Sequence, residues 1–161
     1  MGPNYVQIFI LIVLCASMLR VGVANRNPQH GDHRRLTNID PQKIVVGGST
    51  WTYGFDYTNW AIEHNQFYVN DSLVFKYDLP KDSTTHPYSV YLLPDQTSFA
   101  TCNLAKAVKV ADESQGGGPG FEFVLKEYKP YWFASGGGEG INCNLGKMKF
   151  KVLPLPNSAV Y

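Results

Sequence analysis

Two side chains of this sequence have the chemistry of a nucleophile and its base, namely Ser135 and His86. A serine nucleophile needs a histidine base and an oriented acid, and in many hydrolases it stands in a Gly-x-Ser-x-Gly turn. Neither that turn nor a positioned acid accompanies Ser135, and no pair of carboxylates has a distinguishing context. We therefore expect that the protein is not an enzyme.

The N-terminus has the pattern of a secretory signal peptide over residues 1–24. Ile8–Leu14 is an unbroken apolar run, and Gly22 and Ala24 occupy the −3 and −1 positions of a cleavage site. The run is too short to span a membrane, although an uncleaved anchor is the alternative. Residues 155–161 form a tail without a hydrophobic lipid-anchor signal. The pattern predicts a secreted, extracellular protein without stable membrane insertion.

The number and positions of the cysteines are consistent with an exported protein. Cys15 falls within the signal, which leaves Cys102 and Cys143 in the mature chain. A lone pair in an oxidising compartment is most simply one disulfide, and a loop of about 40 residues closed in this way is stabilised by ~3–4 kcal/mol. Asn70 opens an Asn-Asp-Ser sequon, so we expect N-glycosylation there.

The composition excludes several classes of partner. Charged residues make up 17% of the chain and aromatic residues 14%, which is typical of a folded globular domain. Cleavage after residue 24 leaves 13 basic and 13 acidic side chains, so neither nucleic acid nor an anionic membrane surface is indicated. Residues 25–42 are polar and without an apolar period, and we expect a flexible lead-in there.

From Lys43 onward the apolar residues recur with a period of two, which indicates half-buried antiparallel strands. Short helices are expected only at 59–65 and 103–108. The glycine clusters 116–120 and 136–140 are expected to connect strands rather than to open helices. About seven short strands predict an all-β Greek-key sandwich of two sheets. The alternating runs are 44–46, 73–77, 90–93, 121–126 and 147–152.

The order of several short motifs resembles the phytocyanins, a family of plant extracellular cupredoxins, over residues 43–154. The matching residues are Val46-Gly47-Gly48, Trp51, Tyr57 and Trp60-Ala61, then Asp71, Leu73, Phe75 and Tyr77, the pair Cys102 and Cys143, and Tyr131 through Phe150. The resemblance implies a cupredoxin-like sandwich with one disulfide.

The same resemblance implies where copper ligands would stand. A blue-copper centre uses two imidazoles, a thiolate and a weak axial donor. The thiolate position holds Ser135, the second histidine position holds Asn142, and the first falls at Tyr88. His86 lies two residues early, and only Met148, near the axial position, retains a sulfur. We expect that copper binding is lost and that the protein carries no cofactor.

The resulting hypothesis is a non-redox interaction or recognition protein of the plant cell wall or apoplast, similar to the copper-ligand-deficient early-nodulin-like members. Its partner would be a cell-wall glycan or a receptor ectodomain, and Trp132 is the aromatic residue expected to contribute if it is not buried. The alternatives are the ancestral blue-copper electron transfer and a structural wall protein. The absence of Pro-rich or Ser-rich repeats disfavours a structural wall protein.

Overall fold

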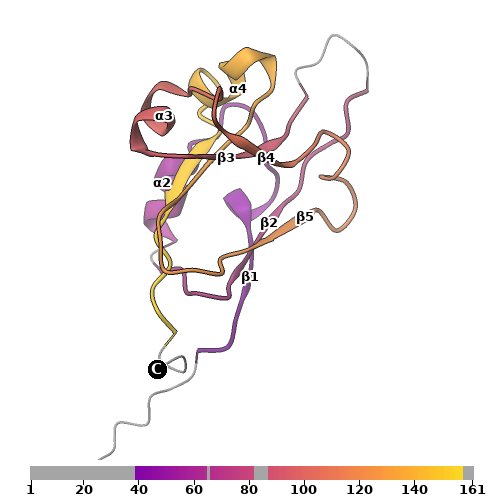
Figure 1. Cartoon of the computed structure of the whole chain (residues 1–161). Coiled ribbons are helices and arrows are strands. Elements are labelled where there is room, and N and C mark those ends of the chain that lie inside the picture. Colours follow the sequence, from indigo (N-terminus) through magenta and orange to yellow (C-terminus); the bar gives the residue numbers. More distant parts are fainter. Residues whose placement is uncertain (1–38, 65, 82–86, 158–161) are drawn as a thin grey trace, which may run out of the picture. The chain divides into compact units, whose positions relative to one another are not determined.

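The computed structural model describes residues 39–64, 66–81 and 87–157, which contain a β-sandwich of two sheets. The predicted signal peptide 1–24, residues 25–38 of the predicted lead-in, and His86 lie outside the described residues. Seven strands are described: β1 Lys43–Val45, β2 Ser72–Phe75, β3 Val90–Leu93, β4 Val108–Ala111, β5 Phe121–Val124, β6 Tyr131–Ala134 and β7 Lys149–Val152 (Figure 1).

The strands form one sheet in the order β1-β2-β5 and a second in the order β4-β3-β6-β7. β1 runs parallel to β2, and the remaining neighbours are antiparallel. Each sheet therefore takes strands from distant parts of the chain. Strand β4 was not among the runs predicted from the sequence, because two of its four side chains, Val108 and Lys109, are exposed and leave no alternation to detect.

The core between the sheets is mainly aromatic. Phe133 and Phe150 stack with ring centroids 5.1 Å apart, and Trp51 meets Phe75 edge-on at 5.4 Å. All four side chains are fully buried, and burial of a side chain of this size stabilises the fold by about 1.5–3 kcal/mol. The predicted alternation of β7 is confirmed, since Phe150 and Val152 are buried whereas Lys151 is exposed.

Three short α-helices connect the strands: α2 Tyr57–Glu63, α3 Gln96–Thr101 and α4 Ile141–Asn144. The predicted helix at 59–65 is confirmed, although it begins two residues earlier because the Asp56 carboxylate caps it at Asn59 N, 3.0 Å away. The predicted helix at 103–108 is wrong. The chain forms α3 instead, where the Asp95 carboxylate accepts a hydrogen bond from Ser98 N at 2.7 Å.

The second glycine cluster also differs from the expectation. It leads into a 3₁₀ turn, η2 Gly138–Gly140, and then into α4, so that it does open helical structure. The disulfide between Cys102 and Cys143 ties the end of α3 to α4, as the sequence predicted. Both helices therefore lie at one end of the sandwich (Figure 1).

The contacts within the folded domain extend a few residues beyond the predicted range of 43–154. Ile39 N donates to the Asn157 side-chain oxygen at 3.3 Å, and Leu155 forms a β-bridge with Tyr68. The start and the end of the described chain are thus joined. No helix among the described residues is long and apolar enough to cross a membrane.

Candidate functional site

Two of the expected copper-ligand positions, Ser135 and Asn142, meet Ser89 at the end of the sandwich where α4 lies. Ser135 follows directly after β6, Asn142 belongs to α4, and Ser89 precedes β3. All three are buried, with relative exposures of 0%, 0% and 1%. Three separate segments therefore supply one enclosed polar cluster.

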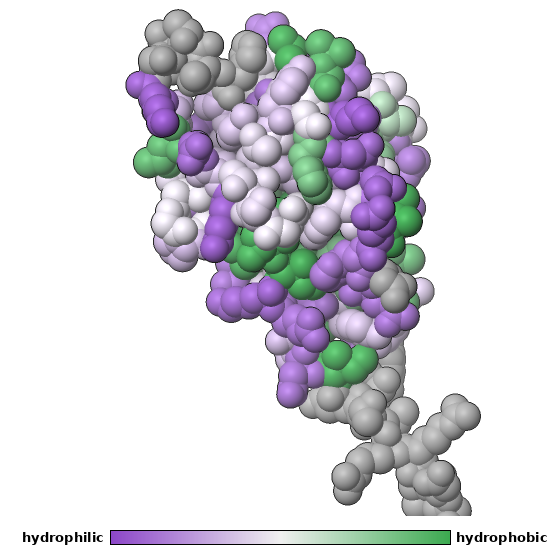
Figure 2. Space-filling view, turned by 180° about the vertical axis from the view of Figure 1, so that it is seen from behind, coloured by the Kyte–Doolittle hydropathy of each residue, from purple (hydrophilic) through white to green (hydrophobic). Residues whose placement is uncertain are grey.

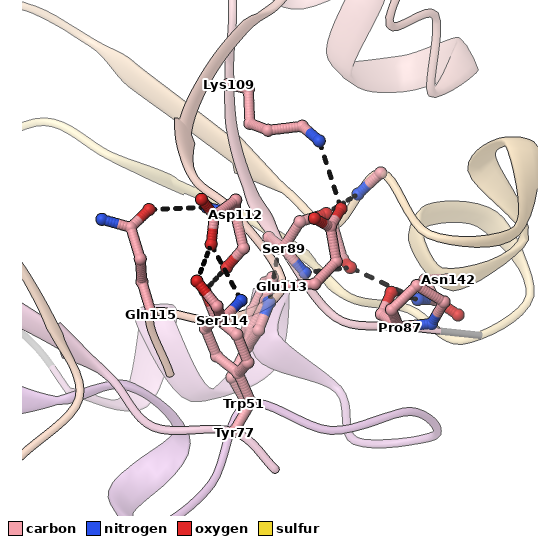
Figure 3. Close-up of polar contacts among 12 residues, drawn as sticks. Trp51, Tyr77, Pro87, Ser89, Lys109, Asp112, Glu113, Ser114, Gln115 and Asn142 are labelled. Carbon is pink, nitrogen blue, oxygen red and sulfur yellow. Dashed lines mark hydrogen bonds and ion pairs between the residues drawn. The ribbon is translucent and has the colours of Figure 1, made fainter. Parts of the chain in front are cut away.

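A network of hydrogen bonds links these residues through side-chain and backbone groups, and Figure 3 shows Pro87, Ser89 and Asn142 within it. Asn142 Nδ2 donates to Pro87 O at 3.2 Å and to Ser135 Oγ at 3.4 Å. Ser135 Oγ also accepts from Ser89 N at 3.4 Å, and Ser89 Oγ accepts from Gly136 N at 3.2 Å. The cluster contains hydroxyl, amide and backbone groups, and it contains no charged side chain.

One atom of the cluster lacks a partner. Asn142 Oδ1 is buried and makes no hydrogen bond to any described residue. Turning the amide around would bring Oδ1 against Pro87 O, so that two acceptors would face each other. The observed orientation is therefore the better one, and the unpaired oxygen costs about 1–3 kcal/mol unless a water molecule reaches it.

Tyr88 does not join the cluster. Its hydroxyl lies 3.3 Å from Thr52 Oγ1 and accepts from Tyr53 N at 3.4 Å, which places it against the loop before α2. The structure thus brings Ser135 and Asn142 together and adds Ser89 instead of Tyr88. Ser89 could not be identified from the sequence, because both Tyr88 and Ser89 precede β3 and the alternation of buried residues along that strand does not distinguish them.

Met148 is fully buried and packs within the main hydrophobic core. Its backbone holds the site, since Met148 O accepts from Ser135 N and Met148 N donates to Asn142 O, both at 2.9 Å. The residue therefore connects the two ligand positions through its main chain.

Close packing around the cluster leaves little free space. A Cβ atom added at Gly137 would lie 2.0 Å from Pro87 O and 2.3 Å from Asn142 Nδ2. At Gly136 an added Cβ would lie 2.3 Å from the Tyr91 ring. Glycine is required at Gly137 because the chain passes directly against a backbone carbonyl, whereas a side chain at Gly136 would displace the half-buried Tyr91 ring.

The donor set does not fit a blue-copper centre. Ser135 offers a hydroxyl where a thiolate is needed, and Asn142 directs an amide N–H, which has no free lone pair, toward the centre of the cluster. Both described cysteines are joined to each other. Within the part of the chain that the structure describes, no three His, Cys, Asp or Glu side chains gather in a manner suited to a metal ion.

The loop that borders the cluster is held by Tyr57. Its hydroxyl donates to Thr50 O at 2.7 Å and accepts from Thr52 N at 2.6 Å. Burial of this ring raises the pKa of Tyr57 to about 12. The phenol is thus a neutral structural group, and it keeps the 50–56 loop in place beside Tyr88.

Exposed apolar side chains surround the buried cluster at the surface. Tyr53 is 47% exposed, Leu145 69% and Ile141 39%. The 50–56 loop and α4 approach each other closely, because Gly54 N donates to Gly146 O at 2.9 Å. On the face seen in Figure 2, hydrophobic residues likewise gather in separate patches among hydrophilic ones.

Trp132, the other aromatic residue considered from the sequence, lies away from this cluster. It is partly buried, packs beside Leu93, Ala134 and the disulfide, and its indole N–H donates to Gln96 Oε1 at 3.2 Å. It also lines a groove on the side of the sandwich.

Two curated plant proteins are similar in sequence to this chain. Early nodulin-like protein 3 of Arabidopsis thaliana is 33% identical over 115 residues, which is 69% of this chain and 50% of that protein. Early nodulin-like protein 12 of the same plant is 31% identical over 103 residues, which is 60% of this chain and 47% of that protein. The chain spans about half the length of these relatives. No family model matches the sequence.

Two solved structures are similar in fold. Cucumber stellacyanin, solved with Cu²⁺ at pH 7.0, has a TM-score of 0.56 and 20% identity, and the match covers 73% of this chain and 98% of that one. Spinach plantacyanin has a TM-score of 0.40 and 19% identity, over 56% of this chain and 81% of that one. The likeness to stellacyanin confirms the predicted cupredoxin-like sandwich.

Proposed function

The chain belongs to the phytocyanin family, and from that premise we propose that it is a secreted, non-redox recognition protein that holds no type 1 copper. The observation that carries the proposal is the buried cluster of Ser135, Asn142 and Ser89, in which two of the expected ligand positions, Ser135 and Asn142, are engaged in hydrogen bonds between neutral groups. A protein of this kind would be neither an enzyme nor an electron carrier.

The chemistry of the cluster supports the loss of copper. A thiolate bond defines the blue-copper centre, and a hydroxyl with its high pKa does not replace it. Asn142 Nδ2 is already engaged by Pro87 O, so the amide would have to break a buried hydrogen bond before its oxygen could face an ion. Such a rearrangement would leave Pro87 O unpaired, at a cost of about 1–3 kcal/mol.

Copper reconstitution of the secreted mature protein tests the proposal. The purified protein is incubated with Cu²⁺ and then dialysed, and its visible absorption and copper content are measured beside cucumber stellacyanin prepared in the same way. We expect no thiolate-to-copper charge-transfer band and no retained copper. An intense visible band at one copper per chain would overturn the proposal and favour the alternative, blue-copper electron transfer.

The recognition role rests on the exposed side chains at the same end. Tyr53, Ile141 and Leu145 present apolar surface to solvent, the Gly54–Gly146 hydrogen bond joins the segments that carry them, and the disulfide fixes α4 to the end of α3. Loops on a rigid sandwich commonly carry binding residues. The proposed partners are a cell-wall glycan or a receptor ectodomain in the apoplast.

Binding screens against plant cell-wall glycans and receptor ectodomains test this part. A Tyr53→Ala/Leu145→Ser variant is expected to weaken any binding found, because it removes exposed apolar contacts without touching the core. Leu153→Ser is the matched control, since Leu153 is also exposed, at 45%, but follows β7. Equal binding by both variants would exclude this end of the molecule as the contact surface.

A further inference from the structure

A groove of about 750 Å³ runs along the side of the sandwich, away from the buried cluster. Strands β3, β4, β5 and β6 all contribute to its walls. Its apolar lining includes Leu92, Val108, Phe123 and Trp132, and Val108 is 63% exposed. This volume lies within the range of ligand-binding sites, which is about 300–1,000 Å³.

The groove follows an open edge of a sheet. β5 pairs only with β2 among the described strands, so its other side is free. Leu125 N donates to Asp71 O, and Leu125 O accepts from Asn70 N, both at 2.8 Å. Because successive residues of a strand direct their backbone groups to opposite sides, the N–H and C=O of Val124 and Glu122 point away from β2.

These outward groups are available for pairing. No hydrogen bond joins the backbone of Val124 or Glu122 to a described residue outside the β2 ladder. Val124 and Glu122 themselves line the groove. An edge of this kind can accept an additional strand, whose side chains would alternate between the groove and solvent.

The charges of the groove favour an acidic occupant. Each of its two glutamates forms an ion pair at the surface, Glu122 with Lys43 at 2.7 Å and Glu127 with Lys129 at 3.0 Å. Lys106 and Lys126 also line the groove, and within the described part of the chain neither has a carboxylate within 4 Å. The groove thus presents two lysines that form no ion pair within the described chain, although the charge of Lys106 also acts on the nearby Asp95 carboxylate.

Charge disfavours the chain's own N-terminal segment as the occupant. Residues 25–38 contain Arg26, Arg34 and Arg35 but only one acid, Asp32. A sugar chain could contact the apolar floor, but it has no backbone N–H and C=O groups at strand spacing to pair with Val124 and Glu122. The open edge therefore favours a peptide over a glycan.

We propose that this groove binds an extended segment of a partner protein, which adds a strand to β5 and places acidic side chains near Lys106 and Lys126 and apolar ones against Val108 and Phe123. The inference goes beyond the proposed function, because it names the chemistry of one partner and a second surface. It does not depend on the absence of copper, so the copper experiment and the experiment below can fail independently.

Selection from a random dodecapeptide display library, with the intact secreted protein as bait, tests the proposal. We expect enriched peptides in which acidic and apolar residues alternate. One enriched peptide is then synthesised and its Kd is measured by fluorescence anisotropy. Lys106→Glu/Lys126→Glu is expected to weaken binding about tenfold or more, whereas Lys76→Glu/Lys81→Glu, whose lysines do not line the groove, should leave it unchanged.

A second variant tests the backbone pairing. Val124→Pro removes an N–H that points away from β2, so the β2–β5 ladder keeps its hydrogen bonds. We expect a folded protein, verified by its thermal unfolding, that has lost peptide binding. In the parent protein, amide exchange at Val124 should slow when the peptide binds.

Three outcomes would overturn the proposal. They are a selection without enrichment, enriched peptides without acidic residues, and peptide binding that the groove variants do not change. Oligogalacturonide, an acidic glycan, is measured in the same assay. Binding of this glycan in the groove without any peptide binding would also overturn the proposal.

Discussion

Replacing Asn142 with aspartate tests how completely the neutral cluster is shielded from water. At low pH the protonated carboxyl has nearly the shape of the amide, and its O–H can donate to Pro87 O as Nδ2 does now. At neutral pH a carboxylate would face that carbonyl in a site with 0% exposure. Both the burial and the carbonyl disfavour the charged form, so the folded-state pKa of the new carboxyl is raised.

The sign and size of the effect follow from proton linkage. The unfolded carboxyl has a pKa of about 3.9, and a shift of about three units is within the range for a fully buried carboxyl such as this one. The native state then binds the proton more tightly, so stability is retained below about pH 4 and falls as pH rises toward 7. Three units at about 1.36 kcal/mol each predict a loss of roughly 4 kcal/mol, a large part of a domain's stability.

Urea unfolding of Asn142→Asp at pH 4 and pH 7, corrected for the parent protein at each pH, measures this difference. Asn144→Asp is the matched control, because Asn144 belongs to the same helix α4 but is exposed. We expect the control to change by less than about 0.5 kcal/mol between the two pH values. If Asn142→Asp behaved like Asn144→Asp, the site would be open to water and the argument for a closed, metal-free cluster would be wrong.

Three further measurements address other parts of the structure. Gly137→Ala should destabilise the protein by about 1–3 kcal/mol in denaturant unfolding, because the new Cβ would meet Pro87 O and Asn142 Nδ2. Gly117→Ala, whose Cβ would only reach Leu79 at 3.7 Å, should change stability little, and equal effects of the two substitutions would contradict the packing described. Burial raises the pKa of Tyr57 and Tyr77 from 10 to about 12, so ultraviolet titration should find two tyrosines that ionise only near pH 12. The stability that these phenols contribute below pH 10 should be lost between pH 10 and 12, whereas titration of all tyrosines near pH 10 would show that both hydroxyls are open to solvent. Asn70 is exposed, with φ 80°, in the turn before β2. Protein produced through a eukaryotic secretory pathway should carry a glycan there that N-glycosidase removes and that the Asn70→Gln variant lacks, and a mass unchanged by N-glycosidase would refute the predicted glycosylation.

Much of the architecture could be predicted from local patterns. The alternation of Leu73, Phe75 and Tyr77 indicated a strand with one buried face, and all three side chains are buried. Such patterns are informative because the period of a strand is two and one face must leave water. Helix α3 and strand β4 were missed for the same reason: α3 has no buried residue and β4 is half exposed, so neither has an apolar face to detect.

The sequence by itself determined which chemistry the expected copper site lacks, because Ser135 and Asn142 are not a thiolate and an imidazole whatever their geometry. It also predicted the disulfide, since removal of the predicted signal peptide would leave two cysteines with one simple pairing. Only the tertiary structure decided that Ser89, rather than Tyr88, completes the cluster, and that an apolar groove bordered by Lys106 and Lys126 follows the open edge of β5. Both depend on contacts between segments far apart in the chain, and such contacts arise from how the two sheets pack, which no local period encodes.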